Sequence, residues 1–122
     1  MTDHDRPGKL ISTTALPALR EVLLADDTWE QIKRKHPELG LIPSFYDAVI
    51  NTVQNPTAVY LSATRPEDSV VFLDSQTTSL GGSPLRIPVK ISAANTAAGF
   101  VSTAHFSDTT SQGTLIWERT DD

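Results

Sequence analysis

The 122-residue chain contains no cysteine, and this absence excludes several kinds of site. Without thiols there is no disulfide framework, no thiolate metal site and no cysteine nucleophile. Histidine is also scarce: the three residues are His4, His36 and His105. Because they include no close pair, we expect no structural zinc site. We therefore predict neither a bound metal nor another cofactor.

Long apolar stretches are missing as well. No run approaches the length of a transmembrane helix, and the N-terminus lacks the apolar core of a signal peptide. These absences predict a cytoplasmic protein without a membrane partner. The sequence also lacks a Gly-rich phosphate loop, a G-x-S-x-G turn and an H-E-x-x-H motif, so the enzyme classes that they define have no support.

The net charge is −5, whereas a domain that binds nucleic acid usually carries a positive field. The cations are unevenly spread, however, because Lys33, Arg34 and Lys35 directly precede His36. This run predicts a local basic patch on an acidic body. At the end of a helix the same run is often only solvated charge that complements the helix dipole, so both interpretations stay open.

The length fits one domain, which we place at residues 9–122 after a disordered, polar lead-in at residues 1–8. A short strand is expected at residues 9–13. The spacing of apolar residues then predicts three helices. The first covers about residues 17–24 with Thr14 as its cap. The second carries Trp29, Ile32, Lys33 and His36 on one face, begins at Asp27 or Thr28, and ends before Pro37.

The third helix begins at a capping box, Ser44 to Asp47, and runs to about Gln54, with Phe45, Val49 and Val53 facing inward. From there the periodicity predicts strands at residues 58–63, 69–73, 85–92, 98–106 and 114–118. Helices followed by a strand meander predict an α+β fold. We expect two or three N-terminal helices packed on a curved antiparallel sheet of about four to five strands.

The two longest predicted strands indicate one polar sheet face. In the first, Leu85, Ile87, Val89 and Ile91 alternate with polar positions. If these strands pair as a hairpin and both Phe100 and Phe106 join the apolar face, Arg86 lies opposite His105. Arg86 and Lys90 then share the other face with Thr103 and His105. A β-bulge would break this register, and Pro88 indicates that one edge of its strand is not fully paired. The alternative is that this face is simply the solvated side of a half-buried sheet.

These polar groups match the needs of RNA cleavage without a metal. A base must take the 2′-OH proton, an acid must protonate the 5′-oxygen, and cations must stabilise the phosphorane. His36 and His105 can divide the acid and base work, and Thr103 can supply a hydrogen bond. The candidate substrate contacts are cationic or aromatic: Lys33, Lys35, Arg86, Lys90, Arg119 and Trp117. Trp117, with Tyr60 as a second choice, can stack on an unpaired base, although packing in the core is the alternative for Trp117.

Several short motifs occur in an order that is typical of one protein family. They are Lys9-Leu10-Ile11-Ser12, Ile32-x-x-Lys35-His36-Pro37-Glu38, Val53-Gln54-Asn55-Pro56 and Gly99-Phe100-Val101-Ser102-Thr103-Ala104-His105. This order resembles the barnase–EndoU–colicin–RelE (BECR) superfamily of small RNases, particularly its phage-associated, barnase-like branch, over roughly residues 9–119. The resemblance implies a helical N-terminal part on a curved antiparallel sheet and metal-independent RNA cleavage in toxin or phage-conflict settings. It places His36 and Thr103 in the site, with His105 beside them, whereas the acidic composition departs from the family pattern.

The expected function is therefore an endoribonuclease-like toxin or effector that leaves 2′,3′-cyclic phosphate ends. Its partners would be RNA (tRNA, rRNA or mRNA) and an antitoxin or immunity protein. The alternative is a catalytically inactive relative that serves as a protein-binding module or structural subunit, whose acidic surface meets a basic partner. The separation of His36 and His105 discriminates between them, because catalysis requires both imidazoles beside one phosphate with Lys33 or Arg86 nearby.

Overall fold

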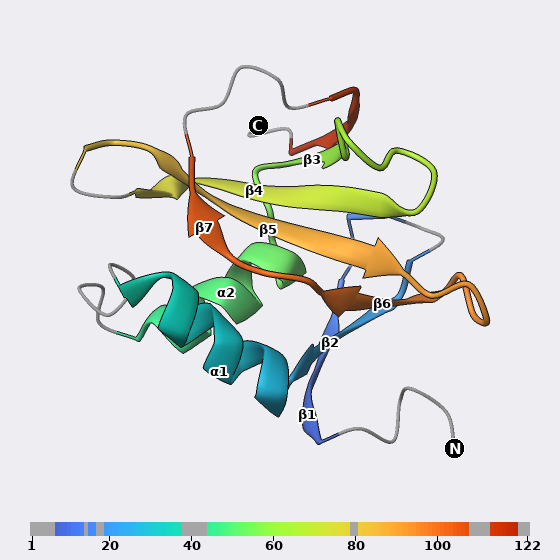
Figure 1. Cartoon of the computed structure of the whole chain (residues 1–122). Coiled ribbons are helices and arrows are strands. Elements are labelled where there is room, and N and C mark those ends of the chain that lie inside the picture. The colour runs from blue at the N-terminus through green and yellow to red at the C-terminus, as the bar shows by residue number, and fades with distance from the viewer. Residues whose placement is uncertain are drawn as a thin grey trace.

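The computed structural model describes residues 7–13, 15–16, 19–37, 44–78, 81–107 and 113–119. Within these residues the chain forms ten elements (Figure 1): β1 (Gly8–Ser12), β2 (Glu21–Ala25), α1 (Asp26–Lys35), α2 (Phe45–Gln54), β3 (Ala58–Leu61), β4 (Ser69–Thr78), β5 (Pro84–Ile91), β6 (Ala98–Val101), β7 (His105–Phe106) and β8 (Leu115–Glu118).

All eight strands belong to one sheet, in the order β1-β2-β6-β5-β4-β3-β8, with β7 paired to β5. Every pairing is antiparallel except that of β2 with β6, which is parallel. Figure 1 shows β4 and β5 as the long central strands, with both helices to one side of them. The described part of the chain is therefore mainly β, with two short helices.

The predicted α+β fold, with two or three N-terminal helices on a sheet of four to five strands, is wrong. Strands β1 and β2 precede the first helix, and the sheet has eight strands rather than four or five. The two helices are inserted between β2 and β3 and do not form a helical N-terminal part. The fold consequently gives no support to a barnase-like architecture.

The principal error concerns residues 17–24, for which a helix was predicted. Residues 21–25 instead form β2, in which Val22, Leu23 and Leu24 are all buried. β2 lies between β1 and β6, and a strand that is buried on both faces has a continuous apolar run rather than an alternating one. Periodicity cannot distinguish such a run from a short buried helix. The expected cap, Thr14, and residues 17–18 lie outside the described residues.

The predicted helix around Trp29 is confirmed as α1, and it ends at Lys35 with His36 as its C-cap, directly before Pro37. It begins earlier than expected, because Ala25 occupies the N-cap and no side chain makes a capping hydrogen bond. The acidic first turn and basic last turn both complement the helix dipole.

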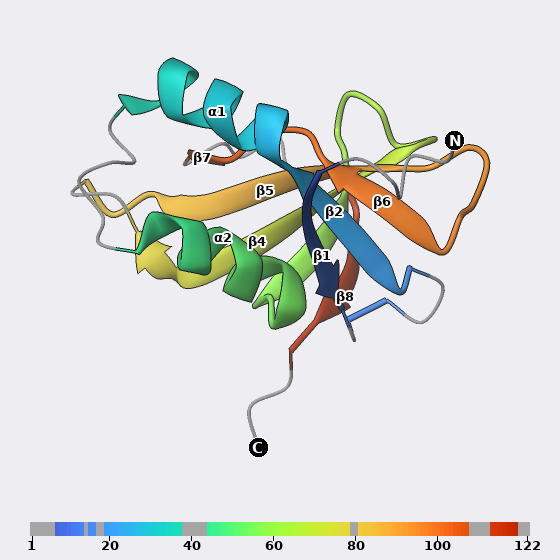
Figure 2. The same ribbon diagram turned by 90° about the horizontal axis from the view of Figure 1, so that it is seen from below.

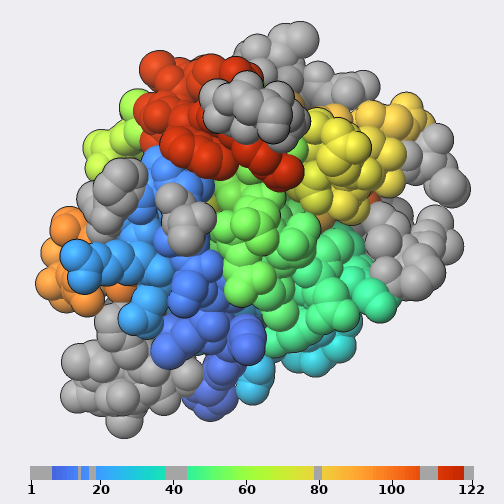
Figure 3. Space-filling model, turned by 180° about the vertical axis from the view of Figure 1, so that it is seen from behind, coloured from blue at the N-terminus to red at the C-terminus, as the bar shows by residue number. Residues whose placement is uncertain are grey.

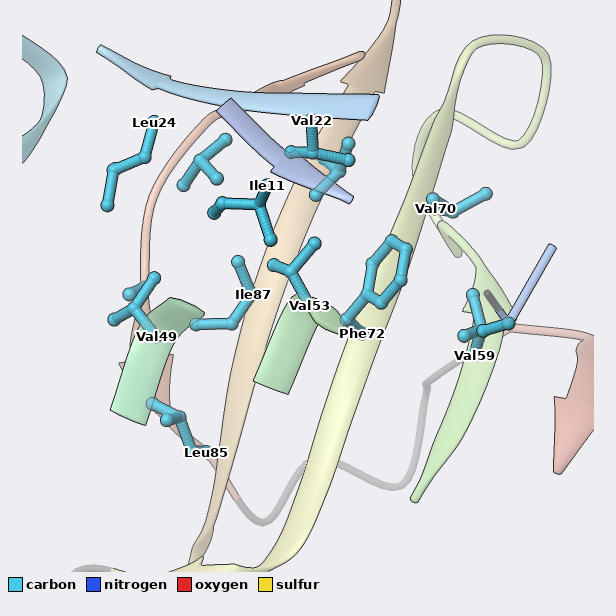
Figure 4. Close-up of a cluster of buried hydrophobic side chains, with 14 of the residues drawn as sticks. Ile11, Val22, Leu24, Val49, Val53, Val59, Val70, Phe72, Leu85 and Ile87 are labelled. Atoms are coloured by element: carbon cyan, nitrogen blue, oxygen red, sulfur yellow. The ribbon is translucent and has the colours of Figure 1, made fainter. Parts of the chain in front are cut away.

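The predicted helix after Ser44 is confirmed as α2, and Phe45, Val49 and Val53 are buried as expected. The predicted capping box is wrong, because the Ser44 side chain makes no cap hydrogen bond and its φ is 57°, in the left-handed region. Val49 and Val53 pack in the same cluster as Ile87 of β5 and Phe72 of β4 (Figure 4). Seen from behind, α2 and β1 lie next to each other on the surface of the molecule (Figure 3).

Most predicted strands are present with shifted ends. The strand expected at 9–13 is β1, which already includes Gly8 opposite Ala25. The remainder of the expected lead-in, residues 1–6, lies outside the described residues. β4 extends to Thr78, and the strand expected at 98–106 is divided into β6 and β7. Among the described residues, no helix has the length and apolar character needed to cross a membrane.

Candidate functional site

The β5–β7 ladder places Arg86 directly opposite His105, as the sequence predicted. Side chains that oppose each other in an antiparallel pair lie on the same face of the sheet. Arg86 is only 5% exposed, whereas His105 is half-buried. The Arg86 Nε donates a hydrogen bond of 3.0 Å to the Ser107 carbonyl, which holds the guanidinium against the end of β7. A buried positive charge is thus fixed beside an accessible imidazole.

The strand that pairs with β5 contains a β-bulge between β6 and β7. From Pro88 to Arg86, β5 advances by two residues, whereas its partner advances by three, from Ser102 to His105. The Pro88 carbonyl accepts a hydrogen bond of 2.9 Å from the Ser102 N–H, but proline has no N–H to return. The extra residue therefore lies where the ladder has already lost a bond, so the predicted incomplete pairing at Pro88 is confirmed.

The predicted position of Phe100 on the apolar face is wrong because of this bulge. In β6, Phe100 lies opposite Lys90, so it shares the outer face with that lysine, and Val101 faces the core instead. Beyond the bulge, Phe106 lies opposite Leu85 and packs against the core, as predicted. The prediction used a single register for the whole hairpin. One inserted residue between β6 and β7 means that the side chains on its two sides no longer follow one alternation between the faces of the sheet.

His36 brings a second imidazole to this place. As the C-cap of α1 it donates its backbone N–H to the Ile32 carbonyl at 3.0 Å. The centroid of its ring lies 6.1 Å from the centroid of the His105 ring, and the two planes are inclined by 30°. The two imidazoles are thus close enough for one phosphate group to contact both.

Aromatic packing explains why α1 and β7 meet. Trp29, on the same helix as His36, stacks on Phe45 of α2 with the ring centroids 5.6 Å apart. Phe45 in turn lies 6.4 Å from Phe106, the residue that follows His105. A continuous aromatic row therefore joins the helix that ends at one imidazole to the strand that carries the other. Figure 2 shows β7 lying between α1 and β5.

The environment of His105 favours one of its protonation states. Burial lowers the pKa of His105 below its ordinary value, and the nearby His36 and Arg86 lower it further. The neutral form of His105 is thereby favoured, and a neutral imidazole can accept a proton. His36 lies directly after the last turn of α1, which contains Lys33, Arg34 and Lys35.

The lysines of α1 lie close in sequence to His36 but differ in surroundings. Lys33 is one helical turn before His36, so both project from the same side of the helix. Its Nζ is 2.9 Å from a Glu30 carboxylate oxygen and 5.8 Å from the centre of the Trp29 ring. Lys35 is exposed and lines a shallow hollow with Gln31 and Arg34 on the outer side of α1.

Two further predicted residues lie along the same sheet. Thr103 is half-buried in the bulged segment, two residues before His105. Lys90 is on the same face of β5 as Arg86 but four residues away, which is about 13 Å at the usual rise of a strand. Lys90 is therefore displaced from the imidazole pair by more than one side chain can span.

The structure does not bring Trp117 and Arg119 to the imidazoles. They lie at β8, roughly 14 Å from β5 because three strand spacings separate the two. Trp117 lies opposite Val59 and packs against the core. The Arg119 guanidinium donates hydrogen bonds to the carbonyls of Asn55 and Pro56, at 2.8 and 3.1 Å. Arg119 thus binds backbone carbonyl groups just beyond the C-terminal end of α2.

The described residues contain no group of three or more histidine, aspartate or glutamate side chains that could hold a metal ion. The fold and the site together define a mainly-β domain with a histidine pair and a buried arginine at one end of its sheet. No protein-family model matches the chain, and neither a curated protein nor a solved structure matches it.

Proposed function

We propose that this chain cleaves single-stranded RNA without a metal, by attack of a 2′-OH on the adjacent phosphorus to leave a 2′,3′-cyclic phosphate. The observation that supports this proposal is the 6.1 Å separation of the His36 and His105 rings, with Arg86 opposite His105. The substrate supplies its own nucleophile, so the protein needs only a base, an acid and positive charge.

The lowered pKa of His105 suits the base. Its neutral imidazole takes the proton of the 2′-OH while the 2′-oxygen forms a bond to phosphorus. The bond between phosphorus and the 5′-oxygen breaks, and His36 gives that oxygen a proton. One proton enters at His105 and one leaves from His36, so the pair returns to its starting state by exchanging protons with water.

The positive charge comes from two sources. Arg86 is buried and hydrogen-bonded to Ser107, so it acts as a fixed charge that favours neutral His105 and stabilises negative charge beside it. Lys33 and Lys35 are exposed on the last turn of α1, and their proposed role is to bind phosphates along the substrate. The proposed role of Thr103, in the bulged segment before His105, is a hydrogen bond to the substrate.

The test is cleavage of an end-labelled RNA pool in the presence of EDTA. Wild type should give products with 2′,3′-cyclic ends, and His36→Gln and His105→Gln should each lose about 100-fold or more in rate. Lys9→Ala is the control, because Lys9 is an exposed residue of β1 outside the proposed site. Absence of products at high protein concentration, or unchanged rates in both histidine variants, would overturn the proposal.

A toxin or effector role fits the same chemistry and the motifs that resemble the barnase–EndoU–colicin–RelE superfamily. A cellular RNA would then be the substrate, and an antitoxin or immunity protein would neutralise the enzyme. Expression of the chain alone should arrest growth, whereas His105→Gln should not. A neighbouring gene whose product relieves the arrest would identify the neutralising partner.

The second candidate function is an inactive protein-binding module, and exposed apolar residues favour it. Leu10 in β1 and Leu115 and Ile116 in β8 are 40–45% exposed, and these strands are the two outermost in the sheet order. Outer strands offer backbone groups to which an extended peptide can pair. Binding of a protein partner that is lost in Leu115→Ser and Ile116→Ser but retained in His105→Gln would favour this function.

A further inference from the structure

A second hollow lies along the same sheet, away from the imidazole pair. It has a volume of about 480 Å³ and is lined by the side chains of Lys90, Phe100 and Ser102, with Ala93 and Ala94 at the β5–β6 turn. None of its lining residues takes part in the proton transfers described above. The proposed proton transfers therefore assign no role to this hollow.

Phe100 lines one side of this hollow and is held in place by neighbouring strands. It lies in β6, which pairs with β2 on one side and β5 on the other, opposite Leu23 and Lys90. The ring is half-buried, and the core cluster contains its neighbour Val101 but not Phe100. An aromatic ring that is held by two neighbouring strands and still partly exposed is a suitable platform for a flat ligand.

The side chains around the ring include a cation and a hydroxyl, which are groups that can bind a nucleotide. Lys90 is exposed directly beside Phe100 and supplies a positive charge, and the exposed Ser102 supplies a hydroxyl that can donate or accept a hydrogen bond. Proteins that bind single-stranded nucleic acid combine such cations along the backbone with aromatic rings on which bases stack.

The position of the hollow relates it to the imidazole pair. Lys90 and Arg86 lie on the same face of β5, and Phe100 and His105 oppose them on the partner strands. Lys90 and Arg86 are about 13 Å apart along β5. An extended nucleic-acid strand that is bound at Lys90 can therefore reach Arg86 without leaving this face of the sheet.

We propose that this hollow is a nucleobase subsite for single-stranded nucleic acid, with a base stacked on Phe100 and a phosphate bound by Lys90. The inference rests on the proposed function, which it deepens by fixing the path of the strand beside the scissile phosphate. Recognition through stacking is tolerant of sequence, so the subsite selects unpaired strands over duplexes rather than one base over another.

The test measures binding apart from cleavage. Fluorescence anisotropy of a labelled 12-nucleotide DNA and a matching 2′-O-methyl RNA should be recorded with the full chain, because neither probe carries the 2′-OH nucleophile. Phe100→Leu should weaken binding by about tenfold, which corresponds to the loss of one stacked base. Lys90→Gln should also lower the slope of log affinity against log salt by about 0.7, since it removes one phosphate contact.

Lys9→Gln is the matched control, because it removes an exposed lysine from the edge strand β1, which is separated from β6 by β2, and should leave the affinity nearly unchanged. A thermal melt shows whether Phe100→Leu is folded, and exposed Lys90 gives a second variant that does not depend on core packing. Absence of probe binding by wild type, or equal affinity in both subsite variants and wild type, would overturn the subsite.

The outcomes separate the two proposals. Loss of affinity in the subsite variants together with an uncleaved RNA pool would support the subsite and overturn the RNase. EDTA-resistant cleavage that depends on both histidines, with unchanged affinity in Phe100→Leu and Lys90→Gln, would support the RNase and overturn the subsite.

Discussion

Arg86 and His105 lie directly opposite each other although the strand that carries His105 has one residue more than a regular hairpin would need. Val101 and Phe106 both pack toward the core, yet they are an odd number of residues apart, which a regular strand does not allow. The bulge between them resolves this conflict. It allows the core to keep both apolar side chains while the imidazole remains on the same face as Arg86.

The first prediction concerns the pKa of His105. Replacing Arg86 by Met or His36 by Gln should raise it, because each change removes positive charge that now favours the neutral imidazole. Titration of the histidine ring signals by NMR measures the effect, with Lys9→Met as a control that should leave the pKa unchanged. An unaltered His105 pKa in both variants would show that the three groups do not interact as the geometry requires.

The second prediction concerns stability against pH. The pKa of His105 is lower in the folded chain than its ordinary value of 6.5, so the unfolded chain binds the proton more readily. This contribution to stability is fully present above about pH 6.5 and is lost as the pH falls through the folded-state pKa. Urea denaturation over roughly pH 5 to 8 should show a smaller acid-induced loss for His105→Gln than for wild type. An equal acid-induced loss of stability in both proteins would contradict a contribution from the lowered pKa of His105.

The third prediction separates structural from substrate-binding roles for Arg119. Arg119→Met should lower the free energy of unfolding by about 1 kcal/mol, because it removes two hydrogen bonds to the carbonyls of Asn55 and Pro56. RNA cleavage by the folded variant should be unchanged. Arg119→Lys should restore stability only in part, since an ammonium lacks the planar fork. Normal stability with reduced cleavage would instead favour the substrate contact that the sequence predicted.

The fourth prediction concerns Gly99, where β6 passes close to β5. A Cβ at this position would lie 2.9 Å from Val89 Cγ1 and 3.0 Å from the Lys90 carbonyl oxygen, which is part of the paired backbone. Gly99→Ala should therefore destabilise the protein by about 1–3 kcal/mol. Thermal denaturation measures the change, and exposed Thr96→Ala in the adjacent turn is the control. A melting temperature equal to that of wild type would show that β6 does not approach β5 so closely.

Sequence reasoning was most successful where a local chemical signal fixed the structure. Pro37 ended α1 at His36, and Asn55-Pro56 ended α2, because each of these sequences disfavours continued helix. It was wrong at residues 21–25 and at Phe100. At residues 21–25 the deciding fact was which strands became neighbours, and a short apolar run carries no signal for that. At Phe100 it was the β-bulge, which changes the face of the sheet on which the side chains lie.

The candidate site was predicted in part. Arg86 opposite His105 was correct, although the register assumed for the rest of the hairpin was not, because the bulge restored the expected pair only near its end. The large distance of Trp117 and Arg119 from the imidazoles could not be predicted, because it depends on β8 pairing with β3 at the edge of the sheet.

The sequence by itself determined the ends of the helices, most strands and the alternation of polar and apolar residues along β5, because these depend on backbone preferences within a few residues. Only the tertiary structure decided that β2 is a strand lying between β1 and β6, that Phe100 faces outward, and that His36 lies 6.1 Å from His105. Those three facts depend on strand pairing and on the packing of Trp29, Phe45 and Phe106, which join segments far apart in the chain and leave no local pattern from which they could be read.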